Sequence, residues 1–224
     1  MIRKLKTSAS APLIESGIWM TPLKRSTGEL MWMRFSDSPS SHVLIVFQPG
    51  RENHVEFLLG GVSFCSGVER VDLGCGDSPL SMRRAIRRYA NAVRSGSTHG
   101  RTVIIIHRLS DVFAHVNRAD TMESLRADMN TIIRSGPSNG IHLIIAQDTS
   151  DYGLGVLNSI DCDVDVTLAV GRLTPVACEL ALGGPVSTAC VRGRTGNLCW
   201  GQVRSNGHHA SGLIDIRESI VGNE

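Results

Sequence analysis

The 224-residue sequence lacks several features that would place it in a specialised class of protein. Aromatic residues make up only 4% of the chain, and the formal net charge is +2, so bulk charge does not indicate a nucleic-acid or anionic-surface binder. The apolar runs are too short to span a bilayer, and the first residues lack the apolar core of a signal peptide. We therefore expect a soluble chain, which could also be one domain of a longer, membrane-anchored protein.

Metal-ligand patterns are also scarce. The six cysteines never form a Cys-x-x-Cys pair, which favours buried free thiols of a reducing compartment over a metal site. Asp161, Asp163 and Asp165 alternate, but the glycine and glutamate of a calcium loop do not follow them, so a solvated strand edge is favoured. A hydrophobic content of 42% and a charged content of 20% are typical of a globular protein with one α/β domain or two small ones.

The stretch from Arg101 to Ser150 organises the rest of the chain. Thr102–Ile106 and Ile141–Ala146 are unbroken apolar runs, which are typical of strands covered on both faces. Between them, apolar residues recur every three or four positions over 121–134, as on the buried face of a helix. Strand, helix and strand form a βαβ unit, so we predict two parallel neighbouring strands with a right-handed crossover.

Similar patterns predict the other elements and the domain limits. The alternation of strands and helices favours an α/β fold with a predominantly parallel sheet and helices on both faces. We expect a flexible lead-in at 1–17, one domain at 18–216 and a tail at 217–224. Strands are predicted at 43–47, 68–73, 164–170 and 213–216, a loop at 48–53, helices after Val55, from Ser78-Pro79 and over 175–182, hairpins at 19–35 and around 195–197, and a polar loop at 205–211.

One predicted helix, over 82–94, carries many arginines opposite its apolar stripe. A solvated face explains them, and we weigh it above a phosphate- or partner-binding ridge because the apolar stripe already accounts for the packing of the helix. These arginines are Arg83, Arg84, Arg87, Arg88 and Arg94.

Three segments stand out, at residues 43–54, 103–111 and 140–147. Together they resemble the core of the FtsK/SpoIIIE-type ATPases, which include bacterial DNA translocases and the ATPase domains of type VII secretion motors (EssC and EccC). Residues 140–147, Gly-Ile-His-Leu-Ile-Ile-Ala-Gln, are similar to the family's G-I-H-L-x-x-A-T-Q segment. Residues 103–111 stand where the family has four apolar residues and D-E-x-x-D, and residues 43–54 stand where it has a strand and G-x-x-G-x-G-K-S. The resemblance implies a RecA-like P-loop NTPase fold.

The first of these motifs departs from the family pattern. A phosphate-binding loop needs glycine N–H groups, a lysine for the β- and γ-phosphates, and a hydroxyl for Mg²⁺. Gly50 is retained, but Glu52, Asn53 and His54 stand at the positions of the last glycine, the lysine and the hydroxyl. A carboxylate at residue 52 would repel a polyphosphate.

The second motif departs as well. His107 and Arg108 stand where the family has an aspartate for Mg²⁺ and a glutamate that activates water. We predict that Arg108 pairs with Glu52 where Mg²⁺ and phosphate would have been. No catalytic residue and no metal ligand is assigned, and no cofactor is expected unless the degenerate site still binds ATP and Mg²⁺. The positions of the vestigial nucleotide site are Gly50, Arg51, Asn53, His54, His107, Arg108, Asp111 and Gln147.

The resemblance implies a non-catalytic, pseudo-ATPase domain of a type VII secretion motor that acts in substrate recognition, assembly or regulation. Its implied partners are secreted helical hairpins of the WXG type and sister ATPase domains, with a hexamer as one arrangement. Its implied place is the cytoplasmic face of the membrane, and DNA is not expected as a partner. Two alternatives stay open: an ATP-dependent DNA translocase or packaging enzyme that uses Gln147 as a phosphate sensor, and an unrelated doubly wound domain that binds a small molecule.

Overall fold

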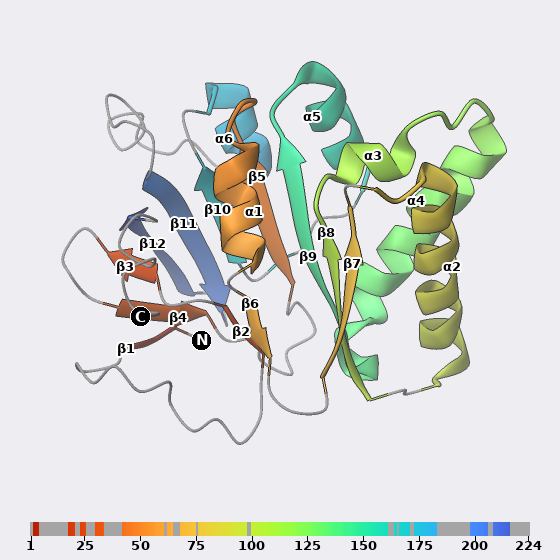
Figure 1. Cartoon of the computed structure of the whole chain (residues 1–224), viewed down its shortest axis with the longest axis horizontal. Coiled ribbons are helices and arrows are strands. Elements are labelled where there is room, and N and C mark those ends of the chain that lie inside the picture. Colours follow the sequence, from red (N-terminus) through yellow and green to blue (C-terminus); the bar gives the residue numbers. More distant parts are fainter. Residues whose placement is uncertain are drawn as a thin grey trace.

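The computed structural model describes residues 42–60, 62–64, 68–74, 76–97, 100–160, 164, 166–170 and 173–182, together with strands nearer the two ends of the chain. The described strands form a ten-stranded mixed sheet and a separate two-stranded sheet (Figure 1). Five neighbouring strands of the large sheet are parallel, in the order β7 (Val68–Leu73), β8 (Arg101–Ile106), β9 (Ile141–Asp148), β5 (Val43–Phe47) and β10 (Val166–Val170).

Antiparallel strands continue the sheet beyond β10. β11 pairs with both β10 and β12, and β3 and β4 form the predicted hairpin next to β12. The small sheet joins β2 and β6. The bounds are β11 (Leu198–Ser205), β12 (His208–Asp215), β3 (Leu23–Arg25), β4 (Leu30–Met33), β1 (Ile2–Lys4), β2 (Ile18–Met20) and β6 (Val62–Phe64).

The predicted βαβ unit is confirmed. β8 and β9 are parallel neighbours, with Thr102 opposite Ile141, and α4 (Ala119–Ser135) connects them. Every residue of β9 is buried, as expected for a strand covered on both faces. β9 runs two residues past Ala146, so Gln147 and Asp148 are its last residues.

Helices lie on both faces of the parallel strands (Figure 1). α2 (Pro79–Ser95) and α4 pack against each other, and their apolar stripes share one core with alternate strand residues such as Ile104 and Leu143. The intervening strand residues, such as Ile45 and Ile105, are buried on the opposite face, which α1 (Glu52–Gly60) covers with Val55 and Leu59. The α/β fold with helices on both faces is therefore as predicted.

The start of α2 follows the sequence signals closely. The Ser78 hydroxyl accepts a hydrogen bond from the Ser81 N–H at 3.1 Å, and Pro79 occupies the first turn. α3 (Leu109–Phe113) and α5 (Asp151–Leu157) follow β8 and β9. α6 (Pro175–Leu182) has the predicted bounds. None of the described helices is both long and apolar enough to cross a membrane.

Two local predictions are wrong. The loop predicted at 48–53 is shorter, because α1 already begins at Glu52. The polar loop predicted at 205–211 is wrong for the residues that the structure describes there: β11 ends at Ser205 and β12 starts at His208, so Ser205 and 208–211 belong to paired strands. Within the lead-in, Ile2–Lys4 forms β1 and pairs with β4. The turn at 195–197, the three alternating aspartates, all six cysteine side chains and the tail lie outside what the structure describes.

Candidate functional site at the carboxyl edge of the sheet

The parallel order brings the carboxyl ends of β5, β7, β8 and β9 to one edge of the sheet. The residues predicted from the family resemblance follow β5 and β8 or lie at the end of β9, so they are gathered at this edge.

The β5–α1 loop turns at Gly50, which has a φ of +86° and open space where a Cβ would be. The Gly50 N–H donates to the Oε1 atom of Glu52 at 3.2 Å. The first side chain of α1 therefore folds back onto its own loop, and its carboxylate lies at the positive end of the helix. The loop itself carries an anion in the form of a protein side chain.

Arg108 binds the same carboxylate. Its Nη2 atom lies 3.3 Å from Glu52 Oε1, and its Nε atom lies 3.4 Å from Asp148 Oδ2 at the end of β9. The pair predicted from sequence, Arg108 with Glu52, is therefore present. Both side chains are more than a third exposed, so solvent screens the pair and its contribution to stability is small.

His107, the neighbour of Arg108, lies between two carboxylates. Its Nδ1 atom is 2.8 Å from Glu56 Oε1 on α1, and its Nε2 atom is 3.2 Å from Asp72 Oδ1 on β7. Asp72 also accepts from Arg70 at 2.6 Å. Arg70 first, and His107 in addition, hold the pKa of Asp72 below its usual value. Both ring nitrogens can donate at once only when the imidazole carries two hydrogens.

The position of the His107 ring depends on a glycine. A Cβ atom at residue 74 would lie 2.6 Å from His107 Cγ, which is closer than non-bonded atoms tolerate. Gly74 follows β7 directly, so its missing side chain leaves the space in which the ring packs.

Gln147 is turned inwards. It is fully buried, its Oε1 atom accepts from the Ser110 N–H at 2.7 Å, and its Nε2 atom donates to the Asp148 carbonyl at 3.1 Å. These bonds tie β9 to α3. They use the amide within the protein, which does not favour a role as a phosphate sensor.

The remaining predicted positions are more scattered. Arg51 is half-buried, Asn53 is exposed in the first turn of α1, and Asp111 is exposed on α3. The side chain of His54 lies outside the described residues. The structure thus links Gly50 to Arg108 through Glu52, whereas Gln147 and Asp111 make no described bond to the β5–α1 loop.

Sequence reasoning missed Glu56, Asp72 and Asp148. Asp72 and Asp148 each lie at or next to the last residue of a parallel strand, and Glu56 lies one helical turn after Glu52. A search for charged residues at strand ends would have found the two aspartates, because the carboxyl ends of parallel strands share one edge.

The edge as a whole is a set of alternating basic and acidic side chains. One chain of contacts runs from Arg70 through Asp72 and His107 to Glu56, and a second from Asp148 through Arg108 to Glu52. Across the described residues, no group of three or more His, Cys, Asp or Glu side chains could hold a metal ion. The basic and acidic side chains here bind one another.

Comparisons with known proteins agree on the fold. No family model and no curated protein matches the sequence. The cytoplasmic domain of the type VII secretion ATPase EccC of Thermomonospora curvata superposes with a TM-score of 0.61 at 13% identity, over 87% of this chain and 28% of that one. The pCW3 conjugation coupling protein TcpA, solved with ATPγS, gives 0.60 at 12% identity, over 94% of this chain and 71% of that one.

A third similar structure comprises ATPases 2 and 3 of EssC from Geobacillus thermodenitrificans, with a TM-score of 0.51 at 9% identity, over 96% of this chain and 47% of that one. The chain thus spans less than half of the EccC and EssC structures. At such low identities the likeness concerns the fold. The chain shares the RecA-like P-loop fold of these structures, which is the fold that the resemblance to the FtsK/SpoIIIE-type ATPases implied.

Proposed function

We propose that this chain is a non-catalytic, pseudo-ATPase domain of a type VII secretion motor, acting in substrate recognition, assembly or regulation. The observation that carries the proposal is the Glu52 carboxylate, which accepts from the Gly50 N–H at 3.2 Å and from Arg108 at 3.3 Å. In the proteins that the sequence resembles, this loop would hold phosphates. Here a side chain of the protein provides the anion.

The residues at the site do not fit Mg²⁺-ATP. A carboxylate about 4 Å from a phosphate oxygen costs about 4 kcal/mol per pair of unit charges near a protein surface. Moving Glu52 aside would free the Gly50 N–H, but the lysine position would still be Asn53. His107 and Arg108 offer nitrogen atoms, whereas Mg²⁺ prefers carboxylate and water oxygens.

One similar structure supports a role in protein recognition. ATPases 2 and 3 of the Thermomonospora curvata EccC were solved in complex with a signal sequence peptide, and they superpose on this chain with a TM-score of 0.50 at 13% identity. We propose secreted WXG-type helical hairpins and sister ATPase domains, in a hexamer as one arrangement, as partners. We place the domain at the cytoplasmic face of the membrane.

Titration with a fluorescent ATP analogue tests the loss of nucleotide binding. The wild type should give no saturable signal, with or without Mg²⁺. Glu52→Gly combined with Asn53→Lys and His54→Ser restores the loop glycine, lysine and hydroxyl, and this triple variant should bind the analogue. Saturable, Mg²⁺-dependent binding by the wild type at micromolar concentrations would contradict a pseudo-ATPase.

A second experiment tests the partner. Calorimetric titration with a purified WXG-type hairpin should show binding that is indifferent to added ATP and Mg²⁺. Binding that appears only with nucleotide, or none to any hairpin from the same secretion system, would remove the proposed role in substrate recognition.

The conjugation coupling protein gives a reason to keep a second function, an ATP-dependent DNA translocase or packaging enzyme. This chain covers 71% of TcpA, a larger share than it covers of EccC or EssC. Such an enzyme would hydrolyse ATP and bind DNA with an affinity that falls steeply with salt. Both properties in the wild-type chain would favour this function over the first.

A further inference from the structure

The five arginines of α2 fall into two groups. Arg87 and Arg94 both bind Asp128 on α4, at 3.4 and 2.6 Å, and Arg83 donates to the Ala114 carbonyl at 2.9 Å. These three hold α2 against its neighbours. Arg84 and Arg88 are exposed, and neither pairs with a carboxylate of the described residues.

The two remaining arginines lie on one stripe of the helix. With about 3.6 residues per turn, five residues of α2 lie within an arc of about 80°. All five are exposed, and Leu80, at 50%, is one of three large hydrophobic side chains exposed to this extent among the described residues. This stripe, the basic ridge, consists of Leu80, Arg84, Arg88, Asn91 and Ser95.

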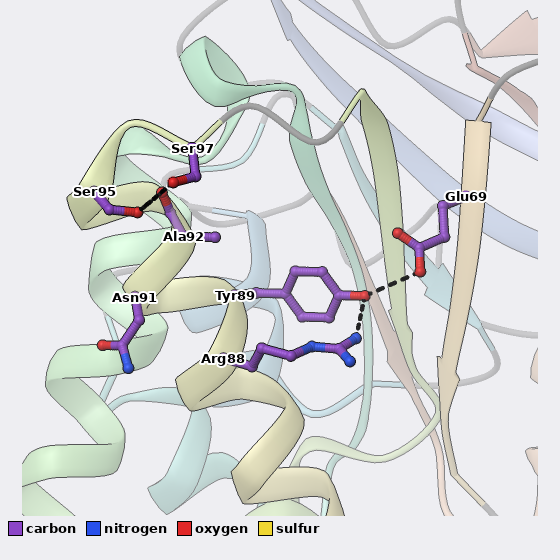
Figure 2. A pocket seen from close by; sticks show the side chains of 7 residues that line it. All are labelled: Glu69, Arg88, Tyr89, Asn91, Ala92, Ser95 and Ser97. Atoms are coloured by element: carbon purple, nitrogen blue, oxygen red, sulfur yellow. Dashed lines mark hydrogen bonds between the residues drawn. The ribbon is translucent and has the colours of Figure 1, made fainter.

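An open pocket borders the basic ridge near the amino end of β7. Figure 2 shows the Tyr89 ring reaching from α2 towards the strand, with its hydroxyl between Arg88 and Glu69. Burial raises the pKa of Tyr89, so the hydroxyl stays protonated and can donate to Glu69. The lining residues are Glu69, Arg88, Tyr89, Asn91, Ala92, Ser95 and Ser97, three of which belong to the ridge.

We propose that the basic ridge and its pocket bind an acidic segment of a partner protein. Arg84 and Arg88 are one turn apart, at about 6 Å, which matches two carboxylates at the same spacing on a partner helix. Leu80 can contact an apolar side chain of that helix, and the Tyr89 ring and Ala92 can contact another in the pocket. Mixed charged and apolar contacts of this kind are typical of protein interfaces.

The same features disfavour nucleic acid. Arg84 and Arg88, which have no carboxylate partner among the described residues, would neutralise only a short stretch of phosphate backbone. The ridge lies on α2, whereas the charges of the carboxyl edge lie on α1 and the strand ends. The inference therefore stands whether or not the carboxyl edge binds nucleotide.

Fluorescence anisotropy with designed peptides tests the proposal. The probe is a labelled helical 16-residue peptide with glutamates four residues apart and leucines on the adjoining face, and its control has glutamine at the glutamate positions. We expect micromolar binding of the glutamate peptide, weaker binding at higher salt, and no saturable binding of the glutamine peptide. Arg84→Glu with Arg88→Glu should weaken binding about tenfold.

Two further variants test whether binding depends on the position of the arginines and whether it uses the pocket. Arg126→Glu makes the same charge change as Arg84→Glu alone, at an exposed position of the neighbouring helix α4, and unlike Arg84→Glu it should leave binding unchanged. Ser95→Trp places a bulky ring at the pocket and should weaken binding. Thermal melts of all variants show that they remain folded. An equal loss in Arg126→Glu, no binding of the glutamate peptide, or tighter binding of a single-stranded oligonucleotide or of phosphatidylglycerol vesicles would overturn the proposal.

Discussion

Polar groups inside the sheet and polar groups at its carboxyl edge are organised in different ways. Inside, His42 is fully buried, and its two ring nitrogens bond the Ile133 carbonyl and the Leu143 N–H, both at 2.9 Å. At the edge, Arg108 and Glu52 remain more than a third exposed. Water can replace a lost partner at the edge, but it has little access to the interior. The interior groups should therefore govern stability, and the edge groups should govern the shape of the site.

The largest expected effect is a loss of stability at acidic pH through the buried His42. The pKa of His42 is lowered to about 4, mainly by burial and also by the nearby His142, against the raising effect of the bond to the Ile133 carbonyl. The unfolded chain binds this proton near pH 6.5, so the stabilisation from neutral His42 is complete above that pH and is lost as the pH falls towards 4. The loss amounts to about 3 kcal/mol.

Urea unfolding at intervals between pH 7 and pH 4 measures this loss. His42→Gln removes the titrating group, so its free energy of unfolding should change less over the same range than that of the wild type. Parallel pH curves for the two proteins would show that His42 does not titrate as the structure implies.

Loss of the salt bridges between α2 and α4 should have the next largest effect on stability. Asp128 is buried and accepts from Arg87 and Arg94, which themselves are about half exposed. Asp128→Ala removes both bonds and leaves the guanidinium groups to water, so we expect a loss of about 2 kcal/mol in the free energy of unfolding. Asp120→Ala, which breaks an exposed pair with Arg118, is the matched control and should change stability little. Equal losses of stability in the two variants would mean that the salt bridges of Asp128 contribute no more than an exposed surface pair.

The same contrast explains how much the sequence could predict. The strands and α4 follow from local apolar patterns, and Ser78-Pro79 marks the start of α2, because each signal lies within a few residues. The Arg108–Glu52 pair was predictable once two motifs were aligned. The roles of Glu56 and Asp72 depend on how β7 and α1 approach His107, and spacing within the chain does not contain that information. Likewise, sequence alone could not separate Arg84 and Arg88 from the three arginines that bind within the fold.

A substitution at Gly74 tests how far the position of the His107 ring depends on the absence of a side chain at residue 74. Gly74→Ala puts a Cβ within 2.6 Å of the present position of the His107 ring, so the ring must move away from Glu56 or Asp72. We expect a loss of about 1 kcal/mol and a shift of the His107 ring resonances in NMR spectra. Combining Gly74→Ala with His107→Ala should recover most of the stability that Gly74→Ala loses. If the loss is the same in the His107→Ala background, the strain arises elsewhere.

The smallest change in stability is expected on removal of the Glu52 carboxylate. Its effect should be seen instead in the hydrogen exchange of the Gly50 N–H. Glu52→Ala breaks screened, exposed contacts, so the free energy of unfolding should fall by about 0.5 kcal/mol or less. The Gly50 N–H loses its acceptor, and its hydrogen exchange should become faster. Glu52→Gln keeps an oxygen at the same place and should preserve slow exchange while weakening the contact with Arg108. If Gly50 exchanges equally fast in the wild type and Glu52→Ala, the carboxylate does not occupy the loop in solution, and the main support for a self-filled phosphate loop is lost.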